Sequence, residues 1–120
     1  MGKAANSSIS LKQIHVTDNF WNKYVHLVKD VIIPYQWDIL NDKLEDVETS
    51  HCIENFKIAA GEKEGEFQGA VFQDTDVAKW LEAVGFVLNY ERDEKLEELA
   101  DETIELIGRA QQPDGYLNTY

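Results

Sequence analysis

The sequence predicts an all-α protein, and three observations support that fold class. Apolar residues recur at three- and four-residue spacing through most of the 120 residues, as on the buried face of a helix. No segment shows a convincing alternation of apolar and polar residues, which is the pattern of a half-buried strand. In addition, 43% of the residues are apolar and only two are proline, a composition typical of a globular chain. The length suffices for one domain with a thin core.

The first helix is predicted to begin at Asp18 or Asn19, since either side chain can cap it. Its apolar face comprises Phe20, Tyr24, Leu27, Val28 and Val31. Pro34 is expected to end or kink this helix, because proline lacks a backbone N–H and crowds the preceding turn. A shorter turn of helix is expected through residues 37–40.

The second helix is predicted to follow Ser50, which can act as its N-cap. Its apolar face comprises Cys52, Ile53, Phe56, Ala59 and Ala60. Gly61 stands where a helix commonly ends on a left-handed glycine. Residues 62–74 are expected to form a loop.

The third helix, at about residues 75–89, is apolar on almost every side. One stripe comprises Val77, Trp80, Leu81, Val84 and Leu88, and further apolar residues are Ala78, Ala83, Phe86 and Val87. Such a helix needs burial on more than one side. We therefore expect it to require neighbours beyond those that this chain supplies.

The fourth helix is predicted from Asp93 to about Gln111. Its inward residues are Leu96, Leu99, Ala100, Thr103, Ile104, Ile107 and Ala110, and its acidic outer face carries Glu97, Glu98, Asp101, Glu102 and Glu105. A turn is expected at Pro113–Gly115. Paired helices at this spacing fit an α/α toroid or a solenoid as well as a bundle.

The formal net charge is −12, from 23 acidic and 11 basic residues. This charge argues against binding to nucleic acid or to an anionic membrane surface, and it favours solubility. No stretch approaches the ~20 apolar residues of a membrane span. Because the N-terminus lacks the apolar segment of a signal peptide, the expected location is cytoplasmic.

Cys52 is the only cysteine, so neither an internal disulfide nor a cysteine-rich zinc site is expected from this chain. We interpret Cys52 as a core residue. The adjacent His51 does not suggest a metal site, because side chains at consecutive helical positions diverge. His51 and Asn55 are four residues apart and hence share one helical face.

Two loops combine the carboxylates, amides and aromatic rings that bind sugars. The candidate substrate-binding residues are Phe72, Gln73, Asp74 and Asp76 in the first loop, and Gln112, Asp114 and Tyr116 in the second. A simpler interpretation makes Asp74 or Asp76 a helix N-cap and Pro113–Gly115 an ordinary turn. The aromatic residues Tyr35, Trp37, Trp80 and Tyr116 could stack on sugars or form core. No catalytic pair of carboxylates can be chosen from spacing.

Four stretches in order and register resemble one family. They are residues 33–42, 50–61, 69–83 and 110–119. Together they resemble the start of glycoside hydrolase family 127, whose type activity is that of a β-L-arabinofuranosidase. The resemblance covers about residues 14–120, the expected N-terminal portion of the catalytic domain. Residues 1–13 are expected to be disordered or tag-like.

The resemblance implies part of an (α/α)₆ toroid and a retaining hydrolysis that uses a zinc-bound cysteine nucleophile and a glutamate acid/base. In the family, these groups lie beyond the point that matches Tyr120, so no catalytic or metal-binding residue is assigned here, and Cys52 does not match the nucleophile's motif. Zinc is expected only in full-length members. The resemblance also implies that the loops at residues 72–76 and 112–116 border the sugar pocket.

We therefore expect an inactive fragment of a glycosidase acting on L-arabinofuranose or a related sugar. Its expected partners are a carbohydrate substrate and the remainder of the catalytic domain, with self-association through exposed apolar surface. The alternative is a non-catalytic acidic α-helical module that binds a partner or a sugar. The chain ends within a loop motif rather than in a capped helix, which favours the fragment.

Overall fold

The computed structural model describes residues 8–120. Every regular element in that range is helical, which confirms the all-α prediction. The elements are a 3₁₀ turn η1 (Leu11–Gln13), α1 (Asn19–Leu27), a π turn η2 (Val28–Ile32), α2 (Ile33–Leu40), α3 (Cys52–Ala59), α4 (Asp74–Tyr90) and α5 (Glu94–Ala110). None of these helices is long and apolar enough to cross a membrane.

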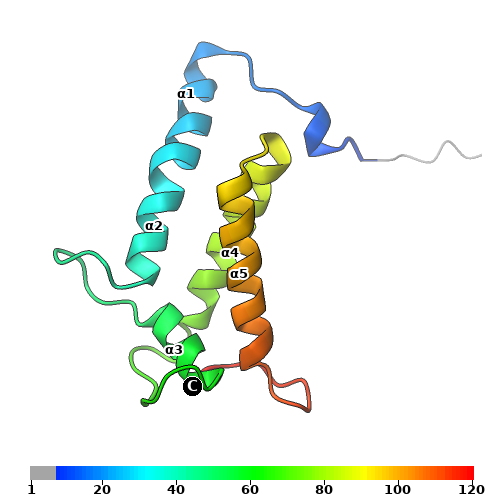
Figure 1. Cartoon of the computed structure of the whole chain (residues 1–120). Helices are drawn as coiled ribbons and strands as arrows, with labels where there is room; N and C mark the ends of the chain where they lie inside the picture. The colour runs from blue at the N-terminus through cyan, green and yellow to red at the C-terminus, as the bar shows by residue number, and fades with distance from the viewer. Residues whose placement is uncertain (1–7) are drawn as a thin grey trace, which may run out of the picture.

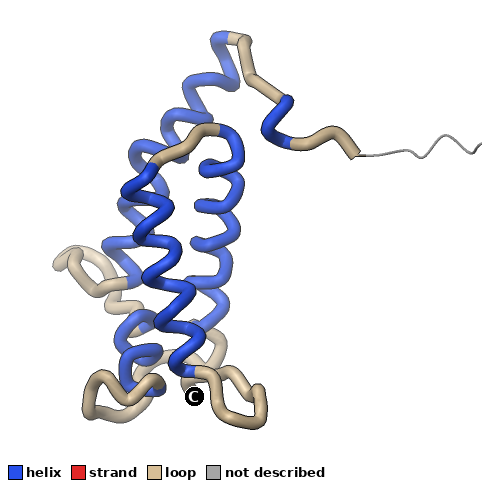
Figure 2. The backbone as a smooth tube through the Cα atoms, turned by 45° about the vertical axis from the view of Figure 1, so that its right-hand side comes forward, coloured by secondary structure: helices blue, strands red, loops and turns tan. Residues whose placement is uncertain are grey.

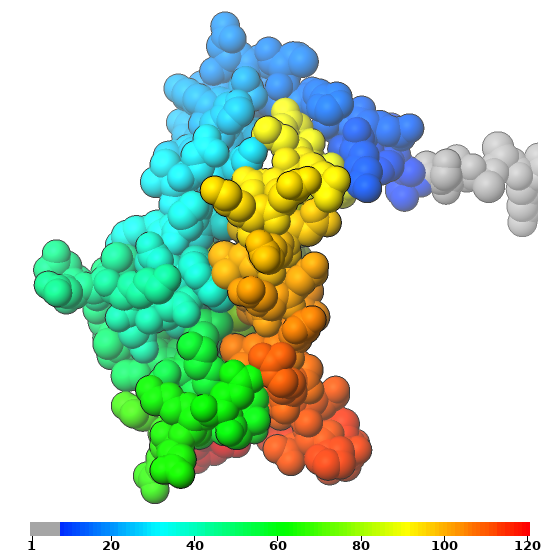
Figure 3. Space-filling model, in the orientation of Figure 1, coloured from blue at the N-terminus to red at the C-terminus, as the bar shows by residue number. Residues whose placement is uncertain are grey.

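The helices form two long columns (Figure 1). One column consists of α1, η2 and α2 in succession, and the other is the antiparallel pair of α4 and α5. The short α3 lies near the end where α2 and α5 finish and α4 begins. Figure 2 shows that most of the loops gather toward that end, where the C-terminus also lies. The loop after α2 projects from the body of the molecule (Figure 3).

The first column begins at Asp18, as predicted. The Asp18 carboxylate accepts hydrogen bonds from the backbone N–H of Phe20 (3.0 Å) and of Trp21 (2.7 Å), which satisfies donors that the helix itself leaves free. Of the two outcomes predicted at Pro34, an end or a kink, the end does not occur: the helical backbone continues through Pro34, with a change of helix type just before it. In the π turn just before it, the N–H of Ile33 donates to the carbonyl of Val28 five residues back. Because this wider turn ends just before Pro34, the proline stands in the first turn of α2, where its missing N–H costs no helical hydrogen bond.

Trp80 of α4 joins the two columns. Its side chain is only 2% exposed, and its indole N–H donates to the backbone carbonyl of Ile33 at 3.1 Å. Trp37 of α2 packs against it with ring centroids 4.5 Å apart. Both tryptophans are therefore core residues, as one of the two interpretations held.

The second predicted helix begins one residue later than expected. Ser50 does not cap α3. The N-cap is His51, whose backbone is left-handed (φ 57°) and whose side chain makes no capping hydrogen bond. The predicted end is confirmed. Gly61 has φ 73°, its N–H donates to Ile58, and the next N–H donates to Lys57, which is the Schellman arrangement.

Helices α4 and α5 match the predictions to within one residue at each end. Asp93 caps α5 by accepting from two N–H groups at 3.1 Å, and the acidic face of α5 is exposed as predicted. The prediction of the inward face of α5 is wrong at one residue: Ile104 is exposed, and Leu106 is buried instead. On α4, the apolar surface extends to an exposed Phe86, in line with the expectation that this helix needs cover on a second side.

Candidate functional site

The helices bring the two loops singled out in the sequence to the same end of the molecule (Figure 2). One loop precedes α4, the other follows α5, and α4 and α5 are antiparallel neighbours. The connection between α2 and α3 reaches the same end. Residues from distant parts of the sequence can therefore act together there.

Asp74 joins the two loops directly. Its carboxylate accepts hydrogen bonds from the backbone N–H of Thr119 at 2.8 Å and from the Thr119 hydroxyl at 2.6 Å. Beside it, the rings of Phe67 and Tyr120 meet edge to face with centroids 5.2 Å apart. The interpretation of Asp74 as an N-cap is wrong, because Gln73 precedes it in helical conformation and the Asp74 carboxylate is free to reach the C-terminal segment.

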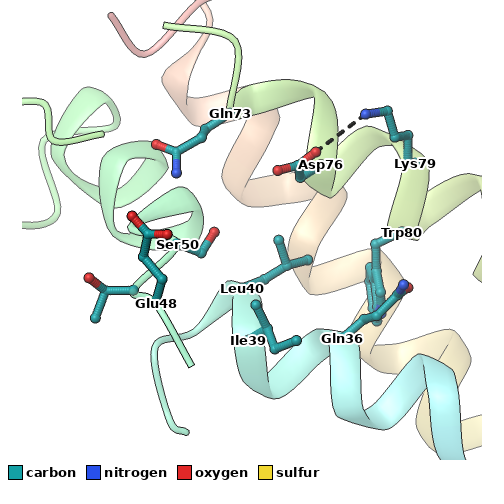
Figure 4. A pocket seen from close by; sticks show the side chains of 10 residues that line it. Gln36, Ile39, Leu40, Glu48, Ser50, Gln73, Asp76, Lys79 and Trp80 are labelled. Atoms are coloured by element: carbon teal, nitrogen blue, oxygen red, sulfur yellow. Dashed lines mark hydrogen bonds and ion pairs between the residues drawn. The ribbon is translucent and has the colours of Figure 1, made fainter. Parts of the chain in front are cut away.

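A polar cleft of about 590 Å³ opens between α2, the 43–50 loop and the start of α4. It is lined by Gln36, Ile39, Leu40, Glu48, Thr49, Ser50, Gln73, Asp76, Lys79 and Trp80. Figure 4 shows Glu48 and Ser50 on one side, with Asp76 and Lys79 on the other. The cleft thus combines carboxylates, amides and hydroxyls over an apolar floor, which is the chemistry that a sugar ring requires.

Two of the seven sequence-predicted residues, Gln73 and Asp76, line this cleft. The Gln73 side-chain oxygen accepts from the N–H of Ala70 at 2.9 Å, which fixes its amide and leaves its NH₂ group free to donate. The carboxylate of Asp76 pairs with Lys79 at 3.3 Å. Asp76 does not act as an N-cap either, since it lies within the first turn of α4.

The remaining predicted residues lie outside the cleft. Gln112, Asp114 and Tyr116 form a tight turn in which the N–H of Gly115 donates to Gln112 and the Asp114 carboxylate accepts from the N–H of Tyr116. Gly115 has φ 91°, so the turn predicted there is confirmed. The rings of Phe72 and Tyr116 are 67% and 56% exposed. Both are available to a ligand at the surface.

Sequence reasoning missed Gln36, Glu48 and Ser50 as cleft residues. Their place in the family-like stretches could have indicated two of them, because Gln36 lies in the first stretch and Ser50 is the first residue of the second. Glu48 lies between the stretches and carried no signal.

Cys52 is a core residue, as predicted. It has no exposed surface, and its Sγ donates to the carbonyl of Gln73 at 3.2 Å. Burial raises the pKa of the Cys52 thiol to about 12, and the carboxylates of Asp74 and Asp76 act in the same direction. Across residues 8–120, no three His, Cys, Asp or Glu side chains are grouped to hold a metal ion. The residues that the structure describes therefore do not form a zinc site.

Comparison with known proteins gives one consistent result. The family described as Beta-L-arabinofuranosidase, GH127 catalytic domain, matches residues 13–120. A non-reducing end β-L-arabinofuranosidase of Bifidobacterium longum subsp. longum is 42% identical, in a match that covers 88% of this chain and 18% of the relative.

Two solved structures share the fold. The crystal structure of a GH127 β-L-arabinofuranosidase from Geobacillus stearothermophilus T6 matches with a TM-score of 0.86 and 63% identity, over 88% of this chain and 17% of the other. A second GH127 β-arabinofuranosidase matches with a TM-score of 0.79 and 31% identity, over 92% of this chain and 17% of the other. The chain thus spans less than a fifth of the length of each of these relatives.

Proposed function

Because this chain belongs to the GH127 β-L-arabinofuranosidase family, we propose that it forms part of the pocket in which an enzyme of that family binds arabinofuranose or a related sugar. The observation that carries the proposal is the cleft. Its polar side chains come from α2, from the 43–50 loop and from the start of α4, so three segments that are separate in sequence converge on one opening.

Within the cleft, we assign the hydrogen-bonding roles by chemistry. The fixed amide of Gln73 presents its NH₂ group as a donor to a sugar hydroxyl. The Asp76 and Glu48 carboxylates accept hydrogen bonds, and the Gln36 amide can both donate and accept them. The apolar face of a furanose ring would lie toward Ile39 and Leu40, which line the floor.

The chemical step is proposed for groups outside this chain. From the family to which the chain belongs, we infer that the hydrolysis is retaining and that its nucleophile, its acid/base and the zinc ligands are supplied by other parts of the catalytic domain. Within residues 8–120, Cys52 is enclosed, and no three His, Cys, Asp or Glu side chains are grouped to hold a metal ion. Alone, the chain is expected to be inactive, because binding groups without a nucleophile or an acid supply little transition-state stabilisation.

A chimeric enzyme tests the proposal. Residues 13–120 would replace the matching segment of the Geobacillus enzyme, which is similar enough in sequence and fold to accept them. In that chimera, Gln73→Ala should lower kcat/KM for an aryl β-L-arabinofuranoside by about tenfold or more. This is the effect expected when one buried hydrogen bond to the substrate is lost. Glu98→Gln, on the exposed face of α5, is the matched control. Unchanged kinetics for Gln36→Ala, Gln73→Ala and Asp76→Ala in a folded chimera would refute the proposal.

A further inference from the structure

Two residues that are not glycine adopt left-handed backbone conformations in the described part of the chain. They are Asp42 (φ 55°) and His51 (φ 57°). Aspartate and histidine adopt this conformation more readily than most residues with a Cβ atom, but it still costs energy relative to glycine. The two residues stand at either end of the 43–50 loop, whose last three residues line the cleft.

Asp42 ends α2 at the position where glycine usually stands. Its N–H donates to the carbonyl of Ile39, and the N–H of Lys43 donates to that of Asp38, so α2 ends in the same Schellman arrangement as α3. At the equivalent position α3 has Gly61, which adopts φ 73° without strain. The aspartate at position 42 is therefore not explained by the backbone of α2.

The Asp42 side chain supplies the explanation. Its carboxylate accepts from the N–H of Ser50 at 2.6 Å and from the N–H of His51 at 3.0 Å. The second carboxylate oxygen lies 3.5 Å from Nδ1 of His51. A charged acceptor at the start of α3 is favoured both by the free N–H groups and by the helix dipole. Asp42, at the start of the 43–50 loop, thus holds the end of that loop at Ser50 close to the end of α2.

This contact sets the position of one side of the cleft. Ser50 is bonded to Asp42 and lines the cleft, and Glu48 and Thr49 precede it directly. Asp42 itself does not line the cleft. The opposite side is carried by α2 and α4, which the buried Trp80 joins independently.

We propose that Asp42 is a positioning residue for the sugar-binding cleft: by holding Ser50 and His51, it fixes Glu48, Thr49 and Ser50 at the distance from Gln73 and Asp76 that the ligand requires. The proposal rests on the proposed function. It adds a residue that touches no ligand and acts through the 43–50 loop.

Asp42→Gly is the decisive variant, because glycine suits the left-handed backbone and removes only the carboxylate. Asp42→Asn retains an acceptor oxygen and tolerates the same backbone. Asp38→Asn is the matched control, since Asp38 is an acidic neighbour that pairs with Lys43 and has no contact with Ser50. Two readouts are needed: amide hydrogen exchange at Ser50 and His51, and, in the chimera with the Geobacillus enzyme, KM and kcat for an aryl β-L-arabinofuranoside.

In Asp42→Gly, exchange at Ser50 and His51 should accelerate by about tenfold or more, and the affinity for the sugar, read from KM, should fall by at least roughly fivefold while the protein remains folded. Asp42→Asn should be intermediate, and Asp38→Asn should match the parent chain. Unchanged exchange, or faster exchange with unchanged affinity, overturns the positioning role alone. Unchanged kinetics of the chimera after Gln36→Ala, Gln73→Ala and Asp76→Ala overturn the proposed function and this role together.

Discussion

The carboxylate of Asp74 binds Thr119 twice, through the hydroxyl at 2.6 Å and through the backbone N–H at 2.8 Å. The two residues are 45 positions apart. Their contact fastens the segment after α5 to the first turn of α4. Both contacts go to one partly buried carboxylate, and the edge-to-face contact of Phe67 with Tyr120 supports the same placement of the C-terminal segment.

Replacing Asp74 by alanine should lower the free energy of unfolding by about 1–3 kcal/mol, the usual range for hydrogen bonds to a charged group. Urea denaturation of Asp74→Ala measures this loss. Asp76→Ala is the control, since its exposed ion pair with Lys79 should contribute less than about 1 kcal/mol. In a double-mutant cycle with Thr119→Val, the two changes should be strongly non-additive. Additive effects would show that the contact is not formed in solution.

Asn55 should be the most sensitive polar residue of α3. It is 1% exposed, its Nδ2 donates to the carbonyl of Gln68 at 2.8 Å, and its Oδ1 accepts from the N–H of Gln68 at 3.0 Å. Asn55→Ala leaves two backbone groups without a partner and should destabilise the chain by about 2–4 kcal/mol.

Gln68→Ala provides a matched control for Asn55, because the Gln68 backbone makes both hydrogen bonds and its side chain makes neither. This variant should change stability by less than about 0.5 kcal/mol. Equal losses in the two variants would indicate that the 62–73 loop is held by other contacts. Thermal or urea unfolding of both variants decides the matter.

The helices could be predicted from sequence because their signals are local. The stripe from Leu96 onward and the cap at Asp93 lie within one segment, and α5 follows them to within a residue. Gly61 was equally informative, since its conformational freedom is a property of the residue itself. The sequence left open whether Pro34 ends or kinks its helix, because the π turn that accommodates Pro34 cannot be read from the apolar pattern.

The site could be predicted only in part, because its geometry depends on contacts between distant residues. The carboxylates and amides of the loops, which are groups that bind sugars, pointed to Gln73 and Asp76, and both residues line the cleft. The simpler interpretation of Asp74 as a helix N-cap is wrong, because its carboxylate binds Thr119. Asp42 ends the first family-like stretch but could not be singled out from sequence, since its partners Ser50 and His51 come into contact with it only when α2 and α3 are placed.

We expect the isolated chain to self-associate through apolar surface. Phe86 of α4 and Trp21 of α1 are 57% and 61% exposed, and they flank an apolar groove of about 490 Å³ between the two helices. Exposed apolar surface of this kind favours association. The net charge of −12 opposes it, so the apparent mass by light scattering should rise with protein concentration and also with salt.

The double substitution Trp21→Glu, Phe86→Glu should weaken this self-association by about tenfold or more. Ile104→Glu is the control, because Ile104 is equally exposed but lies on α5, away from the groove. A parent chain that remains monomeric at high concentration and high salt would contradict the prediction.

Cys52 should make the stability of the chain decrease at alkaline pH. Burial raises the pKa of its thiol from an ordinary value of 9.0 to about 12. Between these two values the unfolded chain loses the thiol proton and the folded chain keeps it, so the stabilisation present below pH 9.0 is lost as the pH rises toward 12. The slope should approach about 1.4 kcal/mol per pH unit at most.

Cys52→Ser isolates this contribution, because a serine hydroxyl can donate to the same Gln73 carbonyl and does not titrate in this range. Urea unfolding from neutral pH to about pH 10.5 should therefore show a steeper loss of stability for the parent chain than for Cys52→Ser. Other groups titrate equally in both proteins and cancel in the comparison. Parallel pH profiles would mean that the thiol is reached by water in the folded chain, and the enclosed position of Cys52 under Gln73 would then be wrong.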